Sequence, residues 1–218
     1  KIQFDCQNAK GEVFKVEHPE HISYLYFPIA SEQGIKGSIT PELGGDLKLD
    51  QNTFVMEPVS AENLHNNRST RNFWCKLEGG KRWSATGSSA ASFAERFTDK
   101  EDDVTLEAGF MWHKMERVSK ENGLKAVVTT FAPIDGNVEV TQVKIINTAD
   151  VSVTFTPVAA VPLYARSADN IRDHRHVTSL LHQIETVENG VIVTPKLSFD
   201  ERGHKKNDIS YFVYGVTG

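Results

Sequence analysis

The stretch GLKAVVTTFAPIDGNVEVTQVKIINTADVSVTFTPVAAVPLY, residues 123–164, decides the fold class. It holds three runs rich in β-branched residues, LKAVVTTF, VEVTQVKIIN and SVTFTPVAAV, and these are separated by the turn-forming groups PIDGN and NTAD. Alternation with a period of two residues is typical of strands, and Gly, Asn and Asp between such runs indicate turns. The stretch therefore predicts three consecutive antiparallel strands.

The same pattern extends on both sides of this stretch. GEVFKV, DLKLD and VTLEAG also read as strands, and LGGD, EGGK, KENG and VENG as turns. Only AASFAERF indicates a helical turn or two, and SATGSSAAS (residues 84–92) reads as a loop tip or a flexible connection. Many short strands at this spacing favour a sandwich or a barrel. We predict an all-β fold, a large antiparallel two-sheet sandwich with little helix, forming a single domain over residues 1–218.

Composition restricts the function. Among 218 residues, 39% are hydrophobic and 24% charged, and the formal net charge is −5, which argues against a general binder of nucleic acid or of anionic membranes. No apolar run is long enough to span a membrane, and no secretory signal is evident, so we expect a cytoplasmic protein. Cys6 and Cys75 form no disulfide framework, and Cys75 in NFWCKLE reads as a small core residue.

The strongest candidate site is YARSADNIRDHRHVTSLL, residues 164–181, where a strongly apolar segment is followed by charge. His174 and His176 would share one face of a strand and could bind a metal with Asp173 or Asp169. No other His or Cys cluster completes such a set, and the neighbouring arginines would repel a cation, so we expect no metal site. A loop that binds an anion or a sugar is one interpretation, because Arg forks fit carboxylates, phosphate and hydroxyl groups. A solvated charged loop is the other, and the residues alone leave both open.

Two further stretches are rich in polar and charged residues. SAENLHNNRSTRNFW, residues 60–74, could line a carbohydrate surface with Trp74 as a stacking platform, or could be an irregular crossover with Phe73 in the core. In LSFDERGHKKN, residues 197–207, Asp200 and Glu201 are adjacent and would point to opposite faces of a strand, so they make a poor acid–base pair. No nucleophile elbow, phosphate loop or zinc-protease motif occurs. We therefore predict that the chain alone is inactive.

Several of these stretches together resemble the N-terminal β-sandwich of glycoside hydrolase family 94, which includes the cellobiose, laminaribiose and chitobiose phosphorylases. The resemblance rests on residues 123–164, on ITPELGGDLKLD, and on NFWCKLEGGKRWSATG with its W-S-x-T element at Trp83–Thr86. It implies a supersandwich similar to galactose mutarotase, expected to precede a helical linker and an (α/α)6 barrel that supplies the general-acid Asp. It also implies an inverting phosphorolysis without a cofactor, in which inorganic phosphate is a substrate.

The resemblance further implies a homodimer in which a sandwich loop reaches the partner's active site. Arg175 falls where the cellobiose phosphorylases carry an arginine on such a loop, although no other residue of IRDHRHV matches the family there. The expected partners are a β-linked disaccharide or oligosaccharide and phosphate, with no nucleic acid and no membrane. A non-catalytic carbohydrate-binding module and a mutarotase-like epimerase stay open as alternatives. The candidate substrate-binding residues are Arg172, Asp173, His174, Arg175 and His176.

Overall fold

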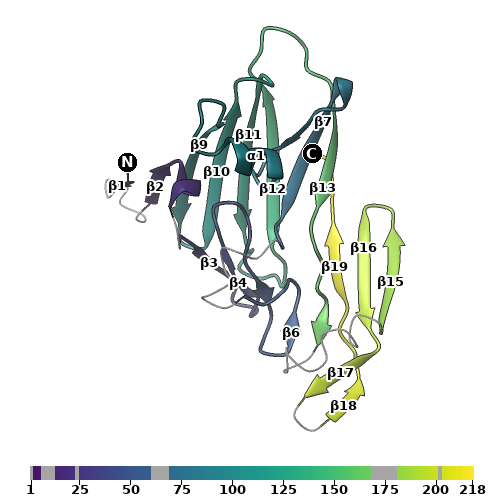
Figure 1. The fold of residues 1–218 in the computed structure, drawn as a ribbon. Helices are drawn as coiled ribbons and strands as arrows, with labels where there is room; N and C mark the ends of the chain where they lie inside the picture. The colour runs from purple at the N-terminus through teal and green to yellow at the C-terminus, as the bar shows by residue number, and fades with distance from the viewer. Residues whose placement is uncertain (1, 6–12, 23–24, 60–68, 168–180, 201–202) are drawn as a thin grey trace.

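The computed structural model describes residues 2–5, 13–22, 25–59, 69–167, 181–200 and 203–218 (Figure 1). In these residues the regular secondary structure is almost entirely antiparallel β-strand. The regular helical elements are one short α-helix, α1 (Ala90–Glu95), and two 3-10 turns, η1 (Pro19–His21) and η2 (Glu78–Gly80). The helical turn expected in AASFAERF is therefore confirmed.

The largest sheet has six strands in the order β1-β2-β9-β10-β11-β12. Along β9, β10 and β11 every second residue is buried, as the period-2 pattern predicted. The edge strand β12 is only half-buried on both faces, which explains the mixed composition of VEVTQVKIIN. The bounds of these strands are β1 Ile2–Asp5, β2 Val13–Glu17, β9 Asp103–Gly109, β10 Trp112–Ser119, β11 Leu124–Phe131 and β12 Val140–Asn147.

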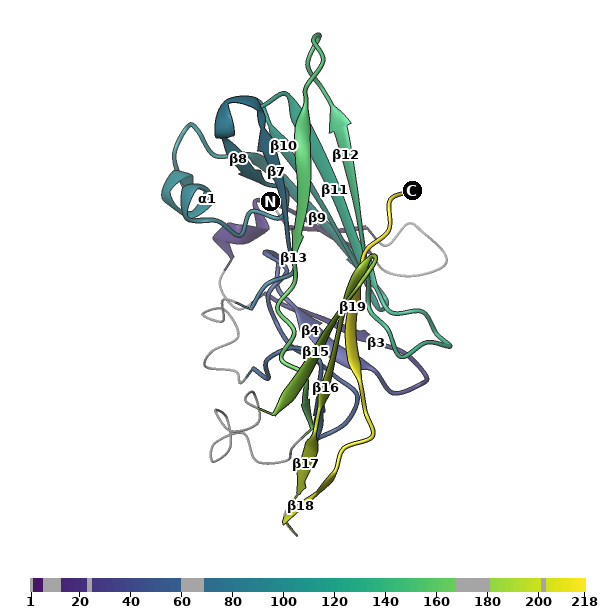
Figure 2. The ribbon, with the colours of Figure 1, turned by 90° about the vertical axis from the view of Figure 1, so that its right-hand side faces the viewer.

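A second layer packs against this sheet. It includes the three-stranded sheet β13-β7-β8 and the five-stranded sheet β14-β6-β5-β4-β3, and Figure 2 shows β7 and β13 in front of the large sheet. The turn predicted at EGGK is confirmed, since it joins β7 to β8 with Cys75 opposite Trp83. The bounds are β3 Phe27–Ala30, β4 Lys36–Ile39, β5 Leu47–Lys48, β6 Thr53–Phe54, β7 Asn72–Leu77, β8 Arg82–Ser84, β13 Phe155–Ala160 and β14 Arg166–Ser167.

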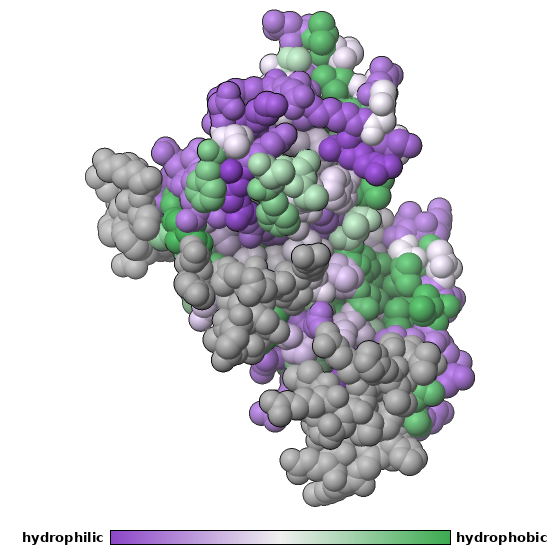
Figure 3. Space-filling model, viewed as in Figure 1, coloured by the Kyte–Doolittle hydropathy of each residue, from purple (hydrophilic) through white to green (hydrophobic). Residues whose placement is uncertain are grey.

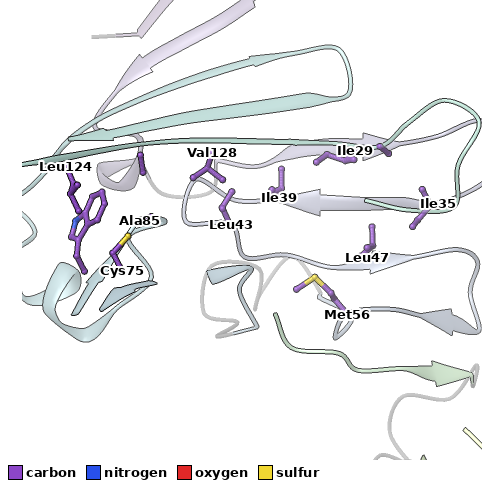
Figure 4. Close-up of a cluster of buried hydrophobic side chains, with 13 residues drawn as sticks. Ile29, Ile35, Ile39, Leu43, Leu47, Met56, Cys75, Ala85, Leu124 and Val128 are labelled. Atoms are coloured by element: carbon purple, nitrogen blue, oxygen red, sulfur yellow. The ribbon is translucent and has the colours of Figure 1, made fainter. Parts of the chain in front are cut away.

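One main hydrophobic core joins the two layers (Figure 4). Leu124, Ala126 and Val128 of β11 pack in the same cluster as Cys75 and Trp83. Cys75 is fully buried, as predicted, and burial raises the pKa of its thiol to about 11, so it is an unreactive core residue. Ala85 follows β8 and Ala132 follows β11, and the rest of the cluster comes from the five-stranded sheet and its loops: Ile29, Ile35, Ile39, Leu43, Leu47 and Met56. Two layers around a shared core confirm the predicted antiparallel sandwich.

The C-terminal strands form a smaller unit beside these layers. β15, β16 and β19 make a three-stranded sheet, and β17 and β18 form a hairpin. Hydrophobic side chains gather on this part of the surface (Figure 3), where Ile184, Phe212 and Tyr214 are exposed. The bounds are β15 His182–Val187, β16 Gly190–Pro195, β17 Leu197–Asp200, β18 Gly203–Lys206 and β19 Tyr211–Tyr214.

Candidate functional site

The five residues predicted to bind substrate, Arg172, Asp173, His174, Arg175 and His176, lie outside the described residues. The structure instead describes the two segments from which this loop starts and to which it returns. We call the segment 168–180 the charged loop.

The outgoing end of the charged loop is held by buried polar contacts. β14 pairs with β6, which places Arg166 opposite Phe54, and Arg166 is only 1% exposed. The Arg166 Nη1 donates to the Tyr164 hydroxyl at 3.0 Å, and the Tyr211 hydroxyl of β19 donates to the Arg166 carbonyl at 2.9 Å. Strands that are distant in the sequence therefore converge on this end.

The returning end is joined to the outgoing end through His182, the first residue of β15. Burial lowers the pKa of His182, and a hydrogen bond with the Ala165 backbone opposes that shift without cancelling it. Ala165 is fully buried and has a left-handed backbone with φ of 48°. Contacts between residues 165 and 182 close the base of the charged loop, and loops on such a rigid scaffold often carry binding residues.

The polar stretch at residues 60–74 contributes to the scaffold wherever it is described. Arg71 is 3% exposed, and it donates to both carboxylate oxygens of Glu139 at 2.6 Å. It also donates to the carbonyls of Leu43, Gly44 and Asp46. Phe73 packs against the core, as expected, and Trp74 is half-buried in β7. Arg71 is thus used by the fold, which argues against a sugar-binding role for it.

The W-S-x-T element is a buried hydrogen-bond network. The Asn72 Oδ1 accepts from the Ser84 hydroxyl at 2.8 Å and from the Thr86 hydroxyl at 2.7 Å. Asn72 Nδ2 donates to the Ser88 carbonyl, and Trp83 Nε1 donates to Asp102 at 2.9 Å. Residues 85–89 lie outside helices and strands, as the prediction of a loop tip or flexible connection for 84–92 expected, whereas Ser84 ends β8 and α1 begins at Ala90. Residues 84–87 are nevertheless buried, because Asn72 satisfies the two hydroxyl groups.

Gly87 ends this element against an arginine. Its φ is +78°, and a Cβ there would lie 2.0 Å from Nη2 of Arg117. Arg117 is 4% exposed and lies 3.4 Å from Asp102, the acceptor of Trp83. A glycine is needed at this point both for the backbone angle and for the space.

In the stretch 197–207, β17 pairs with β18, and Asp200 lies opposite Gly203. Glu201 lies outside the described residues. The prediction that Asp200 and Glu201 are no catalytic pair therefore stays a prediction.

A polar cluster that the sequence reasoning missed lies between η1 and the segment before β9. Its members are His18, Glu20, His21 and Glu101, and one ligand atom from each lies within 4.8 Å of all the others. His21 Nε2 is 2.8 Å and 2.9 Å from the two Glu101 oxygens, and His18 Nδ1 is 3.3 Å from Glu20 Oε1. HPEH at residues 18–21 was a visible signal, but Glu101 is 80 residues away.

In the same cluster, His21 and Glu101 are candidates for a general acid and a general base. Burial would raise the pKa of Glu101, but hydrogen bonds from His21 and the Phe97 N–H, together with the charges of His21 and His18, lower it overall. A mutarotase-like enzyme would need a base and an acid on either side of a sugar. In this structure His21 and Glu101 bond each other directly and do not stand on opposite sides of a cleft.

Comparison with known proteins decides the family. The sequence model of the glycosyl hydrolase 94 supersandwich domain matches residues 56–213, which is most of the chain. The chain belongs to glycosyl hydrolase family 94. No curated protein matches the chain closely enough to count as a relative. The resemblance inferred from the sequence is thereby confirmed.

Within this family 94 chain, the matched range includes β7–β18, all of β19 except Tyr214, the W-S-x-T network and both ends of the charged loop. The η1 residues of the His/Glu cluster lie before the matched range. No helix in the described residues has the length and apolar character needed to cross a membrane.

Proposed function

We propose that this chain is the sandwich domain of an inverting β-glucoside phosphorylase. The reaction converts a β-linked disaccharide or oligosaccharide and inorganic phosphate into a sugar 1-phosphate and a shorter sugar. The observation that carries the proposal is the family 94 match over residues 56–213. The general-acid Asp would belong to an (α/α)6 barrel elsewhere in a longer protein, and the reaction would need no cofactor because phosphate is the nucleophile.

The domain's own contribution would be the charged loop. Its proposed substrate-binding residues are Arg172, Asp173, His174, Arg175 and His176. Arg side chains stay charged at working pH and can donate to phosphate or to sugar hydroxyl groups. The buried contacts of Arg166, Tyr211 and His182 support this role, because they would hold both ends of the loop in place.

Assembly and location follow from the same proposal. The enzyme would be a cytoplasmic homodimer in which the charged loop of one subunit completes the site of the other. It would bind neither nucleic acid nor membranes, consistent with its net charge of −5. Sedimentation of the full-length enzyme as a monomer at micromolar concentration would refute the dimer.

The experiment that tests the proposal compares the chain with the full-length enzyme. Each is incubated with phosphate and cellobiose, laminaribiose, sophorose or chitobiose, and sugar 1-phosphate is measured. We expect phosphate-dependent product from the full-length enzyme and none from the chain above a buffer control. Hydrolysis without phosphate by the full-length enzyme, or turnover by the chain alone, would contradict the proposal.

One observation favours a second function, a non-catalytic carbohydrate-binding module. Phe97 is 73% exposed and Phe93 is 51% exposed at and just after α1, and exposed aromatic side chains can stack on sugar rings. Calorimetry with the same sugars distinguishes the two functions. Sugar affinity that is present in the parent chain and lost in Phe97→Ala would favour a binding module. A phosphorylase domain should have weak or no sugar affinity, and Phe97→Ala should leave it unchanged.

A further inference from the structure

We propose that His18, Glu20, His21 and Glu101 form a binding site for one Zn²⁺ ion. Three of the four residues lie in and beside η1, and the fourth comes from the segment between α1 and β9. This site is separate from the charged loop and does not depend on the proposed phosphorylase activity.

The ligand atoms are already close to the spacing that zinc requires. With zinc–ligand bonds of about 2.0–2.1 Å, the corners of a tetrahedron lie about 3.4 Å apart. The His21–Glu101 contact is 2.8 Å, the His18–Glu20 contact is 3.3 Å, and no pair in the set exceeds 4.8 Å. The separations of the ligand atoms therefore exceed the tetrahedral value by at most about 1.4 Å.

An unsatisfied oxygen gives independent evidence for a ligand. The Glu20 side chain is 5% exposed, and its Oε2 has no hydrogen-bond partner among the described residues. A buried carboxylate oxygen without a partner is costly, since it loses its hydration without compensation. An ion coordinated at this point would supply the missing partner.

The charges around the cluster also favour a cation. Two carboxylates and two neutral imidazoles would balance the double charge of the ion. Of the nearby arginines, Arg96 pairs with Glu42, and Arg117 Nη1 lies 3.4 Å from Asp102 while Arg117 Nε has no partner among the described residues. The His18 side chain is 38% exposed and the His21 side chain 28%, so the ion could enter from solvent.

The two imidazole nitrogens favour zinc over Mg²⁺ and Ca²⁺ at this site. Imidazole nitrogens suit zinc and the later transition metals, whereas Mg²⁺ and Ca²⁺ prefer oxygen ligands alone. The His18 and His21 rings lie within 15° of parallel, so one ring has to turn before both nitrogens point at a single ion. His18 is the more exposed of the two, and its χ2 torsion is soft. His21 is held against Phe97, with ring centroids 4.2 Å apart.

Zinc at this site would tie η1 to a segment 80 residues further along the chain. The expected consequence is a rise in the melting temperature, because an ion that binds only the folded state stabilises it. The competing explanation for this cluster is that its His–Glu ion pairs stabilise the fold directly, without a metal ion.

The test is a calorimetric titration of chelator-treated, tag-free protein with Zn²⁺, alongside its melting temperature. We expect one equivalent to bind with Kd of roughly micromolar or tighter. Glu20→Gln and His21→Ala should each weaken binding by about tenfold or more. The matched control replaces the other histidine pair, His174→Ala with His176→Ala, and should leave the zinc affinity unchanged.

Spectroscopy of the parent protein tests the site without any variant, so it still applies if a variant fails to fold. Bound Co²⁺ should show the intense visible bands of tetrahedral coordination, and X-ray absorption of the zinc form should show only nitrogen and oxygen ligands, including imidazole. The proposal is overturned if no zinc binds below millimolar concentration. It is equally overturned if affinity survives both cluster variants, or is lost only in the His174/His176 control.

Discussion

The side chains of Arg71 and Glu20 are buried to a similar degree, 3% and 5% exposed, but they differ in how completely they are bonded. Arg71 and Glu139 meet through two hydrogen bonds of 2.6 Å, and Arg71 donates further bonds to three backbone carbonyls. In the His18–Glu20–His21–Glu101 cluster, Glu20 Oε2 has no partner among the described residues. The Arg71–Glu139 pair thus belongs to a saturated network, in which the charged groups are fully hydrogen-bonded and fasten the two layers together. The His/Glu cluster is unsaturated, because one carboxylate oxygen is left to bind a ligand.

The largest effect should come from breaking the saturated network. Arg71→Ala leaves Glu139 buried and without its partner, and removes the donor from three carbonyl groups. We expect unfolding free energy to fall by about 3–5 kcal/mol, as is usual when one member of a buried ion pair is removed. Denaturant unfolding measures the loss.

The matched control for Arg71→Ala is the double variant Arg71→Met with Glu139→Leu. It replaces both charges by apolar groups, so it should recover much of the lost stability. If Arg71→Ala is as stable as the parent protein, the pair does not fasten the layers.

An intermediate effect should appear as a pH dependence of stability caused by His113. Burial, aided by the charge of Arg71, lowers the pKa of His113 from 6.5 to about 3. The folded state thus keeps His113 neutral while the unfolded chain takes up a proton below pH 6.5, so stability falls as the pH drops from 6.5 towards 3. We expect about 2 kcal/mol less stability at pH 5 than at pH 8 from this group.

His113→Gln isolates this contribution, because a glutamine has no proton to gain in this range. Its unfolding free energy should change less between pH 8 and pH 5 than that of the parent protein. Equal slopes for the two proteins would show that His113 is protonated, or solvated, in the folded state.

A small effect is expected from Glu20→Gln in the metal-free protein. The substitution removes a buried charge that is only partly compensated, so the lost contact with His18 and the relieved burial should nearly cancel. Unfolding free energy should change by about 1 kcal/mol or less. A loss as large as that of Arg71→Ala would mean that the Glu20 carboxylate is already saturated.

The fold was accessible from the sequence because the strands alternate so regularly. β9–β11 follow the period-2 pattern residue by residue, and Gly, Asn and Asp punctuate the turns. Burial was harder to predict. SVTFTPVAAV reads as apolar, yet Val158 and Val161 are exposed, because β13 lies at the edge of its sheet. The small polar residues 84–87 are buried, because Asn72 comes to meet them from another strand.

One candidate site could be predicted from the sequence, and the other could not. The charged loop was visible as a local concentration of Asp, Arg and His, and its residues stay predictions. The His/Glu cluster was invisible because Glu101 joins HPEH only through the pairing of β2 with β9. Arg71 looked like a surface residue in a polar stretch, and only its five acceptor contacts reveal a structural role.

The central claim, that the charged loop completes a phosphorylase site, is tested most directly by kcat/KM for phosphorolysis by the full-length Arg175→Ala enzyme, measured with its melting temperature. A hydrogen bond to a charged group contributes about 1.5–3 kcal/mol, so kcat/KM should fall roughly 10- to 150-fold. The melting temperature should hardly move, and Arg202→Ala should lower kcat/KM less. Parental kinetics in Arg175→Ala would contradict the claim and leave the loop as a solvated charged surface.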